Sequence, residues 1–105
     1  MTIRGEWANR RVWIGDREVF PTRSQRLWNH SPDGFNWGYG GSGPAQLALA
    51  LMLEFCADEQ EAQQLYQAFK WDVIATLPHG DFELSVERVT EWIEGCRAVR
   101  GGTVG

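Results

Sequence analysis

Residues 34–51 read GFNWGYGGSGPAQLALAL, and this stretch decides how the chain folds. Its first ten residues hold five glycines and three aromatic residues. Glycines at this density allow backbone angles and close backbone approaches that other residues resist. The remainder of the stretch is almost wholly apolar. We therefore expect a tight crossover that leads directly into a buried helix.

The helix itself is predicted from Pro44 to Cys56. Proline suits the first turn of a helix, and Ser42 or Gly43 would be the cap before it. Gln46 stands where its amide reaches back to that cap, as in a capping box. Because this helix carries apolar residues on nearly all of its faces, we expect it to be central and buried.

Two β-hairpins are expected before this helix. Residues 11–14 and 17–20 flank a Gly-Asp pair, and glycine at the first loop position suits a type II′ turn. Residues 26–29 and 35–39 flank a Ser-Pro-Asp-Gly turn. In the latter segment the aromatic residues alternate as they would in a strand.

Two helices and a short strand are expected after the central helix. Asp58, with Glu61 three residues later, marks a helix start, and the apolar stripe that follows continues to Leu77. Residues 82–84 are predicted as a strand. Ser85 would cap a last helix that ends at Gly95, with residues 97–105 as a flexible tail.

The predicted fold is therefore α+β: one domain over residues 1–105, with an antiparallel sheet of three to five short strands packed on three helices. A chain of 105 residues can bury one core. Six tryptophans are too many for a core of this size, so we expect at least one to be exposed.

Charge is distributed unevenly along the chain. Residues 1–40 contain six basic and four acidic residues, whereas residues 41–105 contain four basic and ten acidic ones, which gives the net charge of −4. An acidic protein of this kind is a poor general nucleic-acid binder, because such binding needs a basic face.

Composition also bears on the compartment. The N-terminus has no apolar signal-peptide core, and the longest apolar run, 47–53, is far shorter than a membrane span. We therefore expect a cytoplasmic protein without a membrane contact. Cys56 and Cys96 would then be free thiols in apolar helix positions, and no cofactor is expected.

The central strings resemble a known family. Residues 29–35 (NHSPDGF), 37–44 (WGYGGSGP) and 46–50 (QLALA) are similar to those of a small bacterial and phage domain family of unknown function. The resemblance covers roughly residues 11–95. It implies a compact domain that mobile elements often carry, and it implies no activity, cofactor or catalytic residue.

The leading functional hypothesis is a non-enzymatic protein-interaction module. It would be an accessory protein of a phage or other mobile element that binds and inhibits a host protein. An exposed tryptophan among arginines is a suitable anchor, and an acidic helix face is suited to a basic partner. The candidate contact residues are Arg11, Trp13, Arg17, Arg23 and Arg26 on the N-terminal segments, and Glu87, Glu91 and Glu94 on the last helix.

The alternative is a small-anion or nucleotide site at the start of the central helix. Free backbone N–H groups and the helix dipole attract anions there. Neither a P-loop nor a dinucleotide-binding pattern is present, so a purely structural crossover competes with this interpretation. The candidate residues are Gly40, Gly41, Ser42, Gly43 and Gln46.

Hydrolytic and metal-dependent chemistry have weaker support. A Ser-His-Asp arrangement would have to be drawn from His30, Asp33, Ser42, His79 and Asp81. Proline replaces the last glycine of a G-x-S-x-G nucleophile elbow, and histidine and aspartate beside turns are often structural. The cysteines and histidines lack metal-ligand spacing. We therefore assign no catalytic or metal-binding residue.

Overall fold

The structure is a computed structural model that describes residues 1–102. It is an α+β fold with four strands and four α-helices, one helix more than expected. The strands are β1 (Thr2–Glu6), β2 (Arg11–Ile14), β3 (Arg17–Val19) and β4 (Phe82–Ser85). The helices are α1 (Thr22–Leu27), α2 (Ser42–Phe55), α3 (Glu59–Asp72) and α4 (Val86–Gly102), with a 3₁₀ turn η1 (Ile74–Thr76).

The four strands form one antiparallel sheet in the order β3-β2-β1-β4. The predicted hairpin of β2 and β3 is confirmed, with Gly15 at φ 59° in its turn. The predicted strand β4 is also confirmed, and it pairs with β1 rather than with a neighbour in sequence. β1 was not predicted, because it contains only one strongly apolar residue, Ile3, and a glycine.

The second predicted hairpin is wrong. Residues Thr22–Leu27 form α1, and residues 35–39 form no strand. The backbone after α1 binds the side chain of Gln46, so it has no need of a neighbouring strand. Phe35 and Trp37 are still buried, and the indole of Trp37 donates to the carbonyl oxygen of Gly80 at 2.9 Å.

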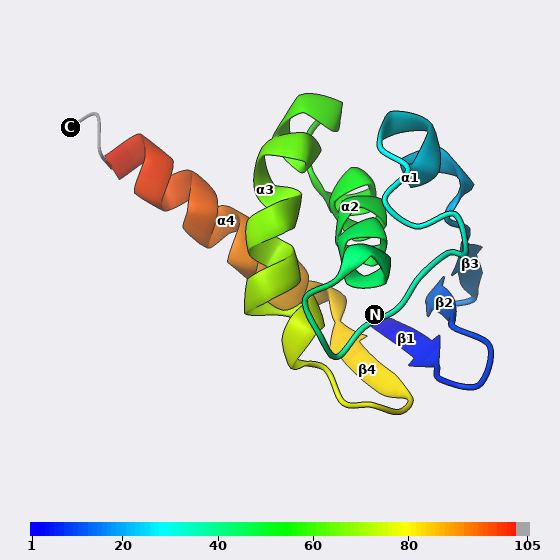
Figure 1. Cartoon of the computed structure of the whole chain (residues 1–105). Coiled ribbons are helices and arrows are strands. Elements are labelled where there is room, and N and C mark those ends of the chain that lie inside the picture. Colours follow the sequence, from blue (N-terminus) through cyan, green and yellow to red (C-terminus); the bar gives the residue numbers. More distant parts are fainter. Residues whose placement is uncertain (103–105) are drawn as a thin grey trace.

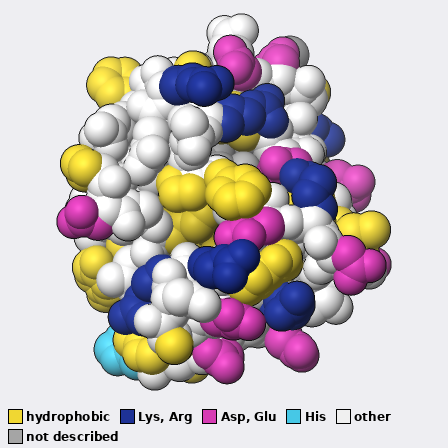
Figure 2. Space-filling model, turned by 90° about the vertical axis from the view of Figure 1, so that its right-hand side faces the viewer, with side chains coloured by type: hydrophobic (Ala, Val, Ile, Leu, Met, Phe, Trp, Pro, Cys, Tyr) yellow, Lys and Arg dark blue, Asp and Glu magenta, His cyan; other side chains and the backbone are white. Residues whose placement is uncertain are grey.

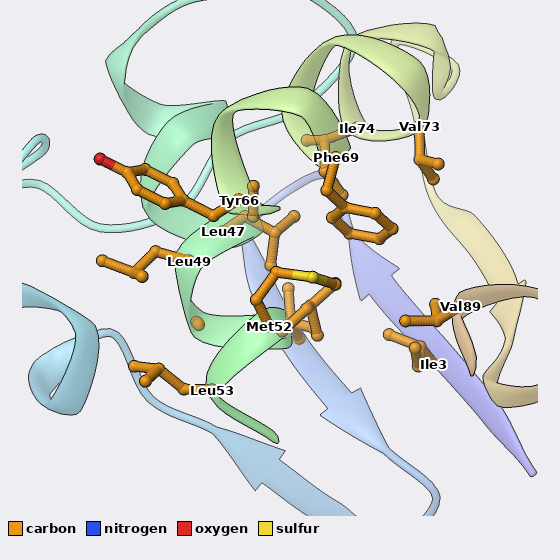
Figure 3. Close-up of a cluster of buried hydrophobic side chains, with 14 of the residues drawn as sticks. Ile3, Leu47, Leu49, Met52, Leu53, Tyr66, Phe69, Val73, Ile74 and Val89 are labelled. Atoms are coloured by element: carbon orange, nitrogen blue, oxygen red, sulfur yellow. The ribbon is translucent and has the colours of Figure 1, made fainter. Parts of the chain in front are cut away.

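α2 is the central element, as predicted (Figure 1). Every residue from Gly43 to Leu53 is buried. Side chains from α2, α3 and the sheet meet in one cluster, among them Met52, Phe69 and Ile3 (Figure 3). The predicted cap is wrong, because Gly41 is the N-cap and no side chain caps the helix.

α3 begins with the predicted cap: the Asp58 carboxylate accepts a hydrogen bond from the N–H of Glu61 at 2.8 Å. The helix ends at Asp72, and η1 separates it from Leu77, where the sequence pattern placed its end. The predicted apolar stripe is largely confirmed, since Leu77 is half-buried and the positions before it are buried: Ala62, Leu65, Tyr66, Phe69 and Val73.

α4 also begins as predicted, since the hydroxyl of Ser85 accepts from the N–H of Arg88 at 3.1 Å. Its predicted end at Gly95 is wrong. The helix continues to Gly102, so residues 97–102 of the predicted flexible tail are helical, while 103–105 lie outside the described residues. Arg97 binds Glu61 of α3 at 2.6 Å, which holds the turn that follows the glycine.

Two further properties concern the whole chain. Cys56 and Cys96 are both half-buried, and they are not joined in a disulfide. Among the described residues, no helix combines the length and the apolar character that crossing a membrane would require.

Candidate functional site

A hollow of about 360 Å³ lies at the N-terminus of α2. Ser42 and Gly43 line it from the first turn of the helix, and Arg10 lines it from the turn between β1 and β2. The rest of the lining comes from the loop before α2: Ser31, Asp33, Gly34, Phe35, Asn36 and Tyr39.

Arg10 is held firmly in this hollow. Its guanidinium lies 3.5 Å from the ring centroid of Trp7, and its Nε donates to the Asn36 side-chain oxygen at 3.0 Å. Its backbone has φ 59°, the left-handed region that few residues other than glycine, asparagine and aspartate adopt. Arg10 could not be identified from the sequence. It lies in the turn between β1 and β2, and β1 was not predicted.

The predicted anion-binding residues do not converge. Ser42 and Gly43 line the hollow, and their N–H groups have no hydrogen-bond partner among the described residues. Gly40 instead lies under the ring of Trp71, and Gly41 lies under the ring of Tyr39.

Gln46 is fully buried and faces the segment after α1. Its side-chain oxygen accepts from the N–H groups of His30 at 2.9 Å and Ser31 at 3.0 Å. Its amide nitrogen donates to the hydroxyl of Ser24 at 2.8 Å and to the carbonyl oxygen of Trp28 at 3.1 Å. Gln46 therefore fastens α1 and the following loop to α2.

His30 and His79 have different hydrogen-bond partners, and neither partner is Ser42. The Nε2 of His30 shares a hydrogen bond with the hydroxyl of Tyr66 at 2.8 Å. The Nε2 of His79 is 2.7 Å from the carbonyl oxygen of Gly38, and its ring stacks on Trp7.

The aspartates complete this picture. Asp81 accepts from the N–H of Trp7 at 2.7 Å, whereas Asp33 and Ser42 border the hollow. In residues 1–102 no hydrogen bond links a histidine to Ser42 or to an aspartate, and no group of three potential metal ligands occurs.

The predicted basic-aromatic residues separate into two sets. On the outer face of the sheet, Trp13 is half-buried, with the guanidinium groups of Arg4 and Arg11 at 4.6 and 5.0 Å from its ring. Arg11 also binds Glu18 at 2.6 Å, and this hydrogen bond lowers the pKa of Glu18. Arg17 binds Glu54 of α2 at 2.8 Å.

Arg23 and Arg26 form the other set. Both are exposed on α1, and neither side chain has an ion-pair or hydrogen-bond partner among the described residues. Phe20 and Trp28, on either side of this helix, are 63% and 55% exposed. Figure 2 shows basic side chains near the top of this face and others lower down, with acidic side chains among them. We call Phe20, Arg23, Arg26 and Trp28 the α1 surface.

Trp28 is exposed but fixed in place. Its ring stacks against His30, and its indole N–H donates to the side-chain oxygen of Gln63 at 3.1 Å. The expectation of an exposed tryptophan is thus confirmed, and Trp71 is also 60% exposed.

The acidic residues of α4 are on the surface, as expected. Glu87 lies 3.3 Å from the N-terminal ammonium of Met1, and Glu91 and Glu94 are exposed. Beside them, an apolar groove of about 470 Å³ separates α3 from α4. Its lining residues are Leu65, Trp92, Gly95, Cys96 and Val99. The groove was not predicted from the sequence, because the predicted last helix ended at Gly95.

The chain was compared with protein families, with curated proteins and with solved structures. The model of a family described as "Family of unknown function (DUF6166)" matches residues 4–95. No curated protein and no solved structure matches the chain. The match covers the sheet except for the first two residues of β1, the hollow beside Arg10 and the α1 surface.

Proposed function

The chain belongs to the family of unknown function DUF6166, and since that membership assigns no activity, we propose from its surface chemistry that it is a non-enzymatic module that binds another protein. The observation that carries the proposal is the α1 surface. There, Arg23 and Arg26 are exposed without an ion-pair partner among the described residues, and exposed aromatic residues precede and follow the helix in the sequence.

The arginines of the N-terminal segments differ in what they can offer a partner. Arg11 and Arg17 already bind carboxylates, so a partner would have to break an ion pair to use them. Arg23 and Arg26 need no such exchange. Arginine and tryptophan are also the residue types most common among the energetically dominant contacts of protein interfaces.

The chemistry of this surface selects an acidic partner. Guanidinium groups bind carboxylates in a bidentate manner, and the flanking rings exclude water from such contacts. The resemblance to a domain family carried by mobile elements favours a host protein as this partner. We propose that binding inhibits the host protein by covering its acidic surface.

The test is affinity capture from a host lysate, with bound proteins identified by mass spectrometry. The tagged wild type is compared with the double variant Arg23→Glu, Arg26→Glu. We expect a stoichiometric partner on the wild type that is absent from the double variant. Capture by both, or by neither, contradicts the proposal.

Two control variants sharpen this comparison. Arg88→Glu makes the same kind of substitution, with half the total charge change, at an exposed position of α4, and it should leave capture intact. The double variant Trp13→Ala, Arg17→Ala removes side chains that are already engaged within the protein, so it too should retain the partner. Thermal unfolding of every variant checks that the fold persists.

A second function, anion or nucleotide binding, is favoured by one observation at the hollow. The Arg10 guanidinium and the unpaired N–H groups of Ser42 and Gly43 border the same space. Both are groups that bind phosphate. We infer that phosphate or a nucleotide added to the labelled protein shifts the amide NMR signals of residues 42 and 43.

The matched variant for this second function is Arg10→Asn. Asparagine tolerates the left-handed backbone at position 10 but carries no cation. Arg4→Asn, on the outer face of the sheet, is the control. Amide signals that do not move with phosphate, or that move equally in Arg10→Asn, exclude this site.

A further inference from the structure

Lys70 is the only lysine of the chain, and among the described residues it is the only charged residue that is buried. Its exposed fraction is 8%. It lies in the last turn of α3, at the end of that helix that contacts the loop before α2 (Figure 1). Buried charges in proteins are usually paired, because an ion that leaves water without a partner loses its hydration. The partners of Lys70 are therefore informative.

The Lys70 ammonium has no hydrogen-bond or ion-pair partner within residues 1–102. Its nitrogen lies 4.4 Å from the ring centroid of Trp71, and this cation–π contact replaces only part of the lost hydration. In the same part of the chain, no buried residue has a solvent-inaccessible side-chain nitrogen or oxygen without a hydrogen-bond partner. Because the Lys70 nitrogen has no such partner, it must be accessible to solvent, so an anion can reach it.

Trp71 places an apolar surface beside this cation. The residue is 60% exposed, yet its ring is held in position. Gly40 packs so closely against the ring that an added Cβ atom would collide with it, and the Lys70 ammonium lies over the same ring. An exposed ring that is already ordered can bind the apolar part of a ligand with little loss of side-chain freedom.

The chemistry of this pair of side chains favours a carboxylate that is attached to an apolar group. One ammonium group balances one negative charge, whereas a phosphate monoester carries about two at neutral pH. Lysine is a compact charge and lacks the planar fork with which arginine binds phosphate at two points. Among the described residues, no second cation lies over the Trp71 ring. An aromatic carboxylate, with a single charge and a flat apolar face, matches both groups.

We propose that Lys70 and Trp71 form a binding site for an organic carboxylate. The ammonium of Lys70 donates a hydrogen bond to the carboxylate, and the apolar group of the ligand lies on the indole of Trp71. Neither residue belongs to the α1 surface or to the lining of the hollow beside Arg10. The site therefore goes beyond the proposed function and does not depend on it.

An NMR titration with benzoate at constant ionic strength tests this proposal. Because the chain has a single lysine, protein labelled with ¹³C-lysine gives one side-chain Cε signal, and it reports on Lys70 alone. We expect saturable shifts of this signal and of the Trp71 indole N–H signal. Benzamide, which has the same ring and no charge, should shift neither signal. Phenyl phosphate should bind no more tightly than benzoate.

Two variants separate the roles of charge and ring. Lys70→Met replaces a buried, unpaired ammonium by an apolar chain of similar length, so the fold should be at least as stable to heat. The dissociation constant for benzoate, measured on the Trp71 signal, should become at least about tenfold larger. Trp71→Ala changes an exposed residue and should weaken benzoate binding to a similar extent, as measured on the Lys70 signal. Arg88→Met, at an exposed position of α4, is the control and should bind as the wild type does.

Several outcomes overturn the proposal. Benzoate that causes no saturable shift in the wild type does so, and so does benzamide that binds as well as benzoate. Tighter binding of phenyl phosphate would show that the site prefers phosphate. If Lys70→Met or Trp71→Ala binds benzoate as tightly as the wild type, the carboxylate lies elsewhere. A Lys70→Met variant that is less stable to heat and leaves benzoate binding unchanged would show that the ammonium has a structural role.

Discussion

At the scale of single residues, the buried amide of Gln46 replaces the neighbouring strand that the loop after α1 lacks. It bonds to backbone groups of Trp28, His30 and Ser31, so this loop is held by one side chain. Its signal in the sequence was a glutamine within an otherwise apolar helix. Gln46 was predicted to cap its own helix, because the sequence cannot show which distant backbone groups a buried amide binds.

Replacement of Gln46 by leucine tests this role. The change removes the side-chain acceptor of the His30 and Ser31 N–H groups, and it removes the donor to the Ser24 hydroxyl and the Trp28 carbonyl oxygen. We therefore expect a loss of about 3 kcal/mol in the free energy of unfolding. Urea denaturation measures it. Gln67→Leu, at an exposed position of α3, should change stability by less than about 0.5 kcal/mol. Equal effects of the two variants would refute the role of Gln46.

Gly38 is a second residue whose identity the backbone dictates. It has φ 85°, and a Cβ atom there would collide with the ring of His79 and lie 3.1 Å from the carbonyl oxygen of Leu77. Gly38→Ala should therefore destabilise the protein by about 2 kcal/mol. Gly80→Ala is the control, since no atom lies within 4 Å of its added carbon and its φ is not positive. Thermal unfolding of the pair decides, and a tolerated alanine at position 38 would show that the loop can move.

At the scale of elements, the sequence predicted an element correctly where residues close in sequence fix its ends. The hairpin of β2 and β3, the cap of α3 at Asp58 and the start of α4 at Ser85 were all predicted, because their determinants lie within four residues. The predictions failed where a distant partner decides. β1 forms because β2 and β4 flank it, and α4 passes Gly95 because α3 binds its next turn.

The first turn of α3 provides a prediction for the dependence of stability on pH. Hydrogen bonds from Arg97 and from the backbone of Ala57 lower the pKa of Glu61 from 4.5 to about 2. Because the pKa is lower in the folded state, the ionised form stabilises the fold. That contribution is fully present above pH 4.5 and is lost as the pH falls through about 2.

Glu61→Gln removes this titration. We expect the fall in unfolding free energy between pH 4.5 and pH 2 to become shallower than in the wild type. Glu59→Gln, an exposed neighbour on α3, should leave the slope unchanged. Denaturant titrations at a series of pH values measure the slopes. An unaltered slope in Glu61→Gln would place the acid-sensitive group elsewhere.

At the scale of the whole molecule, the sheet joins the first strand of the chain to a strand that follows α3. Ile3 of β1 lies opposite Ile14 of β2 on one side and Leu84 of β4 on the other, and it is fully buried. Because β1 contacts early and late segments alike, we expect sheet and helices to unfold together. Although β1 has only five residues, its absence from the predicted fold left out the strand that pairs with both β2 and β4.

Ile3→Ala tests this coupling. Truncation in a packed core should lower stability by about 3 kcal/mol. Transitions followed by tryptophan fluorescence and by far-ultraviolet circular dichroism should shift together and coincide. Arg4→Ala, the exposed neighbour in the same strand, is the control. Helical signal that survives after the fluorescence change would show that the sheet unfolds separately.

The central position of β1 has a consequence for synthesis on the ribosome. β1 leaves the exit tunnel before the other three strands, yet one of its edges has no partner until β4 emerges after α3. Throughout that interval the nascent chain displays an unpaired strand edge and the apolar face of Ile3. The hairpin of β2 and β3 can pair with the opposite edge of β1 early, so the nascent domain remains a three-stranded sheet until β4 is synthesised. Slow decoding of residues between α3 and β4 would lengthen its exposure to chaperones.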